Sequence, residues 1–205
     1  QQFGFIFVKS LFVPEGSDLE TSMASYTEAL KQLGGVEWTT ENLDGTKPLV
    51  YFRTTGGTEQ ELLNIREQRS KAVSDEPVLV VAHPAHNSLP ASLEVLARLQ
   101  QEGAQGQVLY LNSSSDKPGL QKIQDVLIDF QVSSELKQSR IGLLGTPSDW
   151  LVASSPNHSI IKETWGPDIV TVSLDEINSL IKDVVEDTIP AVRDPLVKGA
   201  TEIQE

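Results

Sequence analysis

Short apolar runs alternate with longer amphipathic stretches along almost the whole chain, and this alternation is the feature that most limits its fold. Apolar residues in the longer stretches recur at the spacing of an amphipathic helix. Strands that alternate with helices in this way form parallel βα units. Because the runs are apolar throughout, we expect helices on both faces of the sheet. The sequence therefore predicts a doubly wound α/β fold, flavodoxin-like or Rossmann-like, with a mainly parallel sheet. The expected strands are residues 3–8, 36–40, 49–54, 78–83, 106–112, 140–145 and 168–173.

A polar stretch at residues 131–139, just before the sixth expected strand, marks the expected domain boundary. We therefore expect an N-terminal α/β domain at residues 1–138. Residues 139–205 would hold the start of a second α/β domain and a C-terminal tail. Pro190 and Pro195 argue against a long regular helix in that tail. Since the tail does not resemble a domain end and the only methionine is Met23, we expect the natural protein to extend beyond this chain.

The charge balance limits the kinds of partner. The formal net charge is -13 at pH 7, and such a surface repels phosphate backbones and anionic lipids. We therefore expect neither a nucleic acid nor a membrane as partner. The sequence has no cysteine, which excludes disulfides, thiolate catalysis and thiolate metal sites and fits a cytoplasmic protein. The N-terminal apolar run is interrupted by Lys9, is too short to span a bilayer and lacks the basic region of a signal peptide.

The common motifs of nucleotide-binding and hydrolytic α/β enzymes are missing. No G-x-G-x-x-G follows the first strand, and neither a P-loop nor a G-x-S-x-G nucleophile elbow occurs. His83 and His86 are close in sequence, but Pro84 lies between them and no carboxylate partner lies nearby. Loop histidines bonded to backbone or water are therefore favoured over a metal site. We assign no catalytic residue and no metal ligand in this chain.

Polar residues and glycines gather in the loops that follow three of the expected strands. In a parallel sheet, ligands bind at the carboxyl ends of the strands, so these loops are the candidate ligand site. A pair of glycines lets a backbone approach a ligand and frees N–H groups at a helix start, but it also makes an ordinary tight turn. The candidate residues are Arg53, Thr55, Gly56, Gly57, Thr58, Glu59, His83, His86, Asn87, Ser88, Ser148, Asp149 and Trp150.

Several of these residues also have a purely structural interpretation. Thr58 with Glu61 fits a capping box at a helix start. Asn87 or Ser88 can cap the helix that follows the fourth strand. Trp150 fits either a core position or a flat platform for a sugar ring.

Three segments together resemble a known enzyme family. They are VYFRTTGGTE, HPAHNSLPASLEVLARL and RIGLLGTPSDWLVASS, and they are similar to the N-terminal region of the L-fucose isomerase and L-arabinose isomerase-like proteins. The similarity covers residues 3–187. What the resemblance implies is an activity that interconverts an aldose and a ketose. A divalent metal, usually Mn²⁺, is held there by Glu, Asp and His in a later domain, and no segment of this chain matches that catalytic domain.

The resemblance also implies a role for this chain. In the family, N-terminal lobes help to wall the substrate cleft of a neighbouring subunit and to build the oligomer. We therefore expect a sugar ligand, a homo-oligomer and no cofactor in this chain, with the candidate residues at the cleft rim and the chain inactive alone. Two other hypotheses remain open. One is a stand-alone flavodoxin-like module that binds a small polar ligand at its strand ends, and the other is a purely structural assembly domain.

Overall fold

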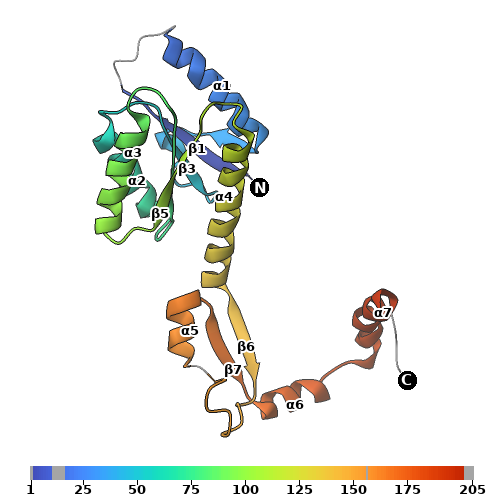
Figure 1. Cartoon of the computed structure of the whole chain (residues 1–205). Helices are drawn as coiled ribbons and strands as arrows, with labels where there is room; N and C mark the ends of the chain where they lie inside the picture. Colours follow the sequence, from blue (N-terminus) through green and yellow to red (C-terminus); the bar gives the residue numbers. More distant parts are fainter. Residues whose placement is uncertain (1, 11–16, 156, 201–205) are drawn as a thin grey trace. The chain divides into compact units, whose positions relative to one another are not determined.

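The computed structural model describes residues 2–10, 17–155 and 157–200, so the end of the N-terminal apolar run, residues 11–13, lies outside the described residues. The chain divides into two compact units, Gln1–Glu135 and Leu136–Glu205, which we call the first unit and the second unit. Figure 1 shows the elements of each. In chain order they are β1 (Phe3–Val8), α1 (Asp18–Gln32), β2 (Gly35–Glu37), η1 (Thr40–Asn42), β3 (Leu49–Arg53), α2 (Glu59–Ala72), β4 (Val78–Ala82), α3 (Ser88–Gln101), β5 (Gly106–Tyr110), α4 (Lys117–Gln138), β6 (Arg140–Leu144), α5 (His158–Trp165), β7 (Asp168–Val172), α6 (Leu174–Lys182), η2 (Glu186–Thr188) and α7 (Ile189–Gly199).

The first unit is built on a five-stranded parallel sheet with the strand order β2-β1-β3-β4-β5. In the centre of the sheet, Phe52 of β3 pairs with Phe7 of β1 and with Val81 of β4. This arrangement confirms the predicted doubly wound α/β fold. The strand order reverses between β1 and β3, and the carboxyl ends of the strands at such a switch point are where open α/β sheets bind ligands.

Helices cover both faces of this sheet, as Figure 1 shows. α1 and α4 pack on one face, in the core cluster that contains Phe52. α2 and α3 pack on the other face, in the cluster that contains Tyr51. Successive residues of a strand point to opposite faces, so a strand covered on both sides is apolar at nearly every position. The uninterrupted apolar runs of the sequence are therefore central strands of this unit.

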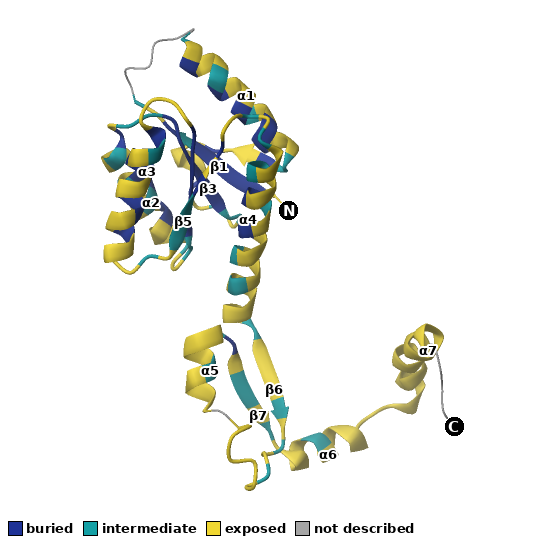
Figure 2. Cartoon of the chain, viewed as in Figure 1, coloured by how far each residue is buried: buried dark blue, intermediate teal, exposed yellow. Residues whose placement is uncertain are grey.

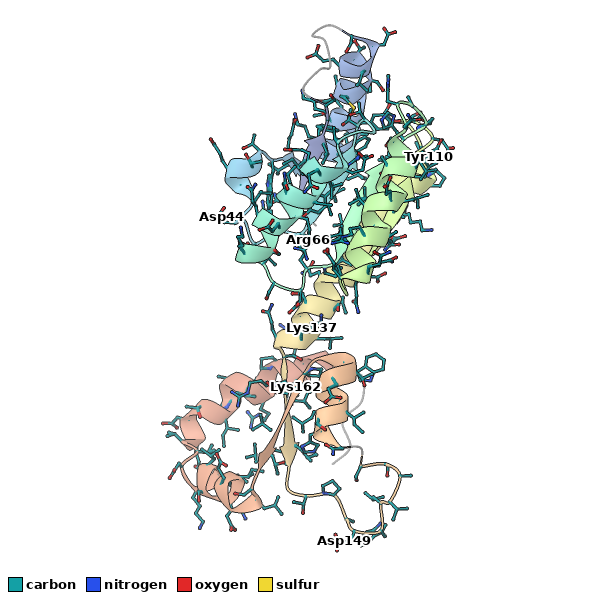
Figure 3. The ribbon with its side chains drawn as sticks, turned by 90° about the vertical axis from the view of Figure 1, so that its left-hand side faces the viewer. Asp44, Arg66, Tyr110, Lys137, Asp149 and Lys162 are labelled. Atoms are coloured by element: carbon teal, nitrogen blue, oxygen red, sulfur yellow. The ribbon has the colours of Figure 1, made fainter. Side chains whose placement is uncertain are left out.

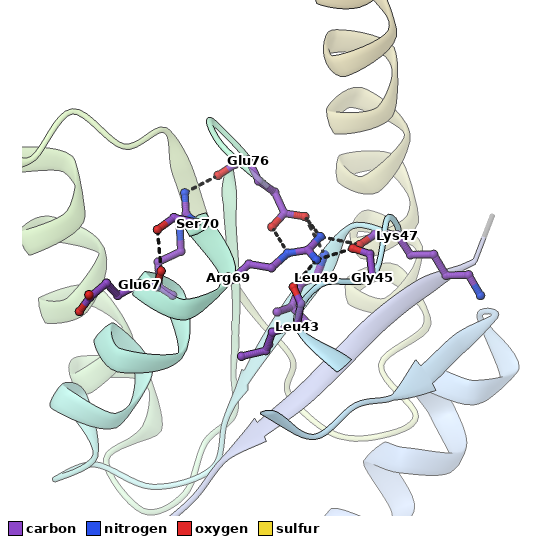
Figure 4. A network of polar contacts seen from close by, with 9 residues as sticks. Leu43, Gly45, Lys47, Leu49, Glu67, Arg69, Ser70 and Glu76 are labelled. Carbon is purple, nitrogen blue, oxygen red and sulfur yellow. Dashed lines mark hydrogen bonds and ion pairs between the residues drawn. The ribbon is translucent and has the colours of Figure 1, made fainter. Parts of the chain in front are cut away.

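A buried arginine, Arg69 of α2, ties together the loops at the amino-terminal edge of the sheet (Figure 4). Its Nε and Nη2 atoms lie 2.7 and 2.8 Å from the two carboxylate oxygens of Glu76. Its guanidinium also lies 5.5 Å from the centre of the Trp38 ring. The remaining N–H groups donate to three backbone carbonyls, those of Leu43, Gly45 and Lys47. One side chain thus connects α2 with the segments that lead into β3 and β4.

Within its described residues, the second unit has no comparable core. β6 and β7 form a two-stranded parallel sheet, and Pro167 is the one buried residue within the described ranges 136–155 and 157–200. Figure 2 shows this unit almost entirely in the exposed and intermediate colours. A two-stranded sheet buries little apolar surface, and many large apolar side chains of this unit are exposed. The exposed large apolar side chains are Leu136, Ile141, Leu144, Trp150, Leu151, Val152, Ile160, Trp165, Leu174, Leu180, Ile181, Val184, Val185, Ile189, Val192, Leu196 and Val197.

The unit boundary and the tail differ from what the sequence predicts. The division falls after Glu135, inside α4, because the polar residues before Gln138 continue the helix instead of forming a linker. The tail contains α7, a helix of 11 residues, although Pro195 lies inside it. Pro190 stands in the first turn, where its missing N–H has no helical partner to lose. The two prolines therefore do not prevent a helix of ordinary length.

Candidate functional site

The ends of β3 and β4 are joined below the surface by Ser88, the first residue of α3. Its hydroxyl donates to the carbonyl of Arg53 at 2.6 Å and accepts from the backbone N–H of His83 at 3.1 Å. In the register of these parallel strands, those two backbone groups are the next pair that would bond directly. The hydroxyl therefore takes the place of the next ladder bond and sets the spacing of the two strand ends.

The loops after β3 and β4 also meet through their backbones. The N–H of Gly56 donates to the carbonyl of His86 at 2.8 Å. A Cβ atom at Gly56 would lie 3.0 Å from the Cβ of Asn87, so a side chain there would press the two loops apart. His86 and Asn87 both have a φ of 55°, in the left-handed region that non-glycine residues seldom adopt. Strained backbone of this kind is concentrated at functional loops.

The end of β1 reaches the same place. The N–H of Ser10 donates to the hydroxyl of Thr55 at 3.0 Å, and the N–H of Thr54 donates to the carbonyl of Val8 at 3.0 Å. The ends of β1, β3 and β4 therefore meet at the switch point of the sheet. The side chain of Thr54 is buried here, and its hydroxyl has no hydrogen-bond partner within the described residues.

The accessible residues at this edge form a group that we call the polar rim. Gly57, His86 and Asn87 are exposed, whereas Thr55 and Glu59 are half-buried. The candidate residues below the rim are buried and hold it in place. The rim consists of Thr55, Gly57, Glu59, His86 and Asn87, and the buried layer of Arg53, Thr58, His83 and Ser88.

Arg53, the last residue of β3, is a buried cation below the rim. Its Nη1 donates to the carbonyl of Thr58 at 2.9 Å, and its Nη2 lies 3.0 Å from Oε1 of Glu59. The N–H of Gly57 donates to the same carboxylate oxygen at 3.2 Å. Burial lowers the pKa of the Arg53 guanidinium, and the negative charge of Glu59 opposes that shift. Arginine stays protonated in proteins, so the lowered pKa measures the cost of removing this charge from water.

His83 lies in aromatic surroundings under the loop of β4. Its ring stacks on Phe52 with ring centres 5.9 Å apart and lies 5.7 Å from the ring centre of Tyr26. Its Nε2 is 2.9 Å from the carbonyl oxygen of Thr54, and because a carbonyl only accepts, Nε2 carries the proton of the neutral ring. Burial lowers the pKa of His83 below its ordinary value, His86 lowers it further, and the bond to Thr54 opposes the shift.

The lowered pKa of His83 predicts a loss of stability in acid. In the unfolded chain this histidine takes up a proton near pH 6.5, whereas in the folded protein it resists protonation until the pH is lower. Below pH 6.5 the unfolded state therefore binds more protons, and the free energy of unfolding falls until the folded histidine is protonated as well. Urea unfolding above and below this pH is expected to show a weaker pH dependence in His83→Gln than in the wild type. The exposed His158→Gln in the second unit is the control, and an unchanged pH dependence in His83→Gln would contradict the prediction.

The caps predicted for α2 and α3 are wrong, although both helices begin where the sequence predicts. Thr58 makes no capping bond, because its hydroxyl donates to the carbonyl of Thr55 at 2.9 Å. Asn87 precedes α3 without a capping bond, and the hydroxyl of Ser88 is engaged by the strand ends. The hydroxyl groups of Thr58 and Ser88 thus bond to the strand ends and loops of the site rather than to the helices.

The loop after β6 follows a strand of the second unit. β6 pairs with β7 in the second unit, so Ser148, Asp149 and Trp150 follow a strand of a different sheet. Figure 3 labels Asp149 in this loop. Trp150 is 79% exposed, which excludes the core position considered for it.

Sequence reasoning missed a polar cluster near the end of β5, where Figure 3 labels Tyr110. Burial raises the pKa of Tyr26 of α1, and the charges of Tyr110 and Asp116 raise it further. The N–H groups of Asn112 and Gly119 donate to Asp116 at 2.9 and 3.1 Å and lower the pKa of its carboxyl. Asp116 could be recognised from the sequence as a helix cap, but no local pattern links it to Tyr26.

Neither the other features of the described residues nor comparison with known proteins assigns a function to this site. Among the residues that the structure describes, no three or more His, Asp or Glu side chains come together as a group able to hold a metal ion. No helix in the described ranges is long and apolar enough to cross a membrane. The chain matches no protein-family model, and a comparison with curated proteins likewise finds no match.

Proposed function

We propose that the first unit binds a small sugar at the polar rim, and that the chain is the N-terminal, non-catalytic portion of an aldose–ketose isomerase-like protein. One observation carries the binding proposal. The loops of β3 and β4 are bonded together at the switch point of the sheet, where His86 and Asn87 stay exposed in left-handed conformations. The link to an isomerase rests on the three segments that resemble that family.

The rim offers the groups that a polyhydroxylated ligand requires. Asn87 and His86 have both donors and acceptors, Thr55 has a hydroxyl and Glu59 has a carboxylate. Hydrogen bonds within and below the loops fix these positions before a ligand arrives, so binding loses little conformational entropy. A small ligand also suits a chain with a net charge of -13, which repels large polyanionic partners.

The exposed apolar side chains of the second unit support a role within a larger assembly. Leaving such side chains in water is unfavourable, so a covering layer would stabilise this unit. We propose that further α/β polypeptide of a sugar isomerase-like protein supplies that layer. A divalent metal such as Mn²⁺ would belong to the catalytic part and act there as a Lewis acid on sugar oxygens. In a cytoplasmic homo-oligomer, the polar rim would then face the cleft of a neighbouring subunit.

A stand-alone module for a small polar ligand is the second candidate. The core of the first unit favours it, because the five-stranded sheet is covered on both faces by helices of this unit. Such a domain can hold a ligand at its strand ends without help from another subunit. This candidate shares the polar rim with the first proposal but requires no catalytic part.

Titration of the chain with L-fucose and with L-arabinose, followed by NMR, tests binding at the rim. Asn87→Gly keeps the left-handed backbone, which glycine adopts freely, and removes only the side-chain amide. We expect this variant to bind the sugar about two- to tenfold more weakly, as the loss of a neutral hydrogen bond predicts. Asn64→Ala changes an exposed amide on α2 away from the rim and is expected to bind as the wild type does.

Two results would contradict the proposal. An absence of sugar-dependent shifts at the rim, or an equal loss of affinity in Asn87→Gly and Asn64→Ala, would exclude sugar binding at the rim. Conversion of either sugar by this chain in the presence of Mn²⁺ would show that the chain is catalytic by itself.

A further inference from the structure

The carboxylate of Glu59 occupies a position where three sources of positive potential converge. Its Oε1 lies 3.0 Å from Nη2 of Arg53 and accepts the N–H of Gly57 at 3.2 Å. It also lies at the start of α2, a helix of 14 residues, where the helix dipole is positive. Donors in this arrangement are the ones that bind carboxylate and phosphoryl oxygens in proteins.

Arg53 provides the second, independent observation. The guanidinium is fully buried, and within the described residues its Nε has no hydrogen-bond partner. Nη2 lies 3.0 Å from Oε1 of Glu59 and forms an ion pair with it. A buried guanidinium has five N–H donors, and those without an acceptor cost free energy. Glu59 thus neutralises the charge of Arg53 while leaving part of its donor capacity unused.

The position of Glu59 is also open to exchange. Glu59 is 32% exposed, so its carboxylate can turn outward into water. Gly57 has a positive φ, and a Cβ added there would meet no atom within 4 Å, so the space beside its Cα is free. An incoming group can therefore approach the same donors from the side of the solvent.

We propose that Arg53, Gly57 and the first turn of α2 form an oxyanion site, in which the Glu59 carboxylate is a built-in occupant that a carboxylate or phosphoryl group of a ligand replaces. The bound oxyanion accepts the N–H of Gly57 and the unused donors of Arg53, and Glu59 moves to the exposed side. If the polar rim binds sugars as proposed above, the ligand class is a sugar that carries an acidic group. The oxyanion site itself does not depend on that function.

Glu59→Ala tests the site by removing the occupant. The variant leaves Arg53 buried without its counter-ion, so we expect a lower melting temperature than that of the wild type. Acetate or phosphate is expected to restore most of the lost melting temperature with a saturable dependence on concentration. Sodium chloride at equal ionic strength is expected to restore much less. Rescue by acetate alone assigns the site to carboxylates, and stronger rescue by phosphate assigns it to phosphoryl groups.

Three further variants make the test decisive. Glu61→Ala removes an exposed carboxylate from the same helical turn and is expected to show no anion-dependent rise beyond that of the wild type. Adding Arg53→Met to Glu59→Ala is expected to abolish the rescue. Should Glu59→Ala fail to fold, Glu59→Gln keeps an acceptor for Gly57 and is measured in its place. Equal effects of acetate, phosphate and chloride, or equal effects in the Glu59 and Glu61 variants, would overturn the proposal, whatever the result of the sugar titration.

Discussion

Arg69→Ala is expected to lower the free energy of unfolding of the first unit by about 3–5 kcal/mol, the cost of breaking a buried ion pair from one side. The side chain of Glu76 is only 9% exposed. The change therefore leaves a nearly buried carboxylate without its ion-pair partner. It also removes the donor from three backbone carbonyls and the cation from the face of Trp38. Urea unfolding followed by far-UV circular dichroism measures the loss.

Arg98→Ala is the matched control for this prediction. Arg98 also pairs with a glutamate, Glu102 at 2.8 Å, but its side chain is 61% exposed. An exposed pair of this kind contributes about 0–1 kcal/mol. Arg69→Lys keeps the charge but cannot reproduce the planar set of donors, so its stability should lie between that of the wild type and that of Arg69→Ala. Equal losses in Arg69→Ala and Arg98→Ala would contradict the role that we assign to Arg69.

The second large effect is expected for Ser88→Ala, about 2–4 kcal/mol of the free energy of unfolding, because two buried backbone groups lose their partner at once. These groups are the N–H of His83 and the carbonyl of Arg53, which the Ser88 hydroxyl connects. The expected loss is large for the removal of one oxygen atom. Urea unfolding gives the energy, and amide hydrogen exchange at His83 is expected to accelerate.

Ser92→Ala separates this bridge from the general effect of removing a buried hydroxyl. Ser92 is as buried as Ser88 and lies on the same helix, but its hydroxyl donates to a helical carbonyl, that of Ser88, at 2.8 Å. That carbonyl can keep its helical partner after the substitution, so we expect a loss of about 1 kcal/mol or less. A loss in Ser92→Ala as large as that in Ser88→Ala would show that the bridge is not the cause.

Much of the fold follows from the sequence, because its signals are local. β3 and β4 are runs of apolar residues that only a sheet covered on both faces accommodates, and both were predicted to within a residue. Which strands share a sheet is not a local property. β6 has the same kind of pattern and yet pairs with β7 in a separate sheet, so the apolar pattern alone does not place the loop around Trp150.

The sequence predicts where two of the candidate loops lie but not how they are bonded. The loops around Gly56 and His86 were expected at strand ends, and the structure joins them there. The partners of their hydroxyl groups could not be predicted, since Thr58 and Ser88 fit helix caps equally well in sequence. The choice between a cap and a loop bond depends on tertiary contacts, such as the approach of β3 to the start of α3. The position of Tyr26 also depends on a tertiary contact, because the packing of α1 places this residue beside the strand ends. It therefore could not be recognised from the sequence.

The amino ends and the carboxyl ends of the strands in the five-stranded sheet have different consequences for how such a protein changes over evolutionary time. The Arg69 cluster secures the amino-terminal edge, at the other end of the strands from the polar rim. Substitutions of the exposed His86 and Asn87 therefore leave the bonds of this cluster intact. Below the rim, the Ser88 bridge keeps the two loops at a fixed separation while their exposed side chains vary. A scaffold of this kind can acquire a new ligand preference in few mutational steps without first having to become more stable.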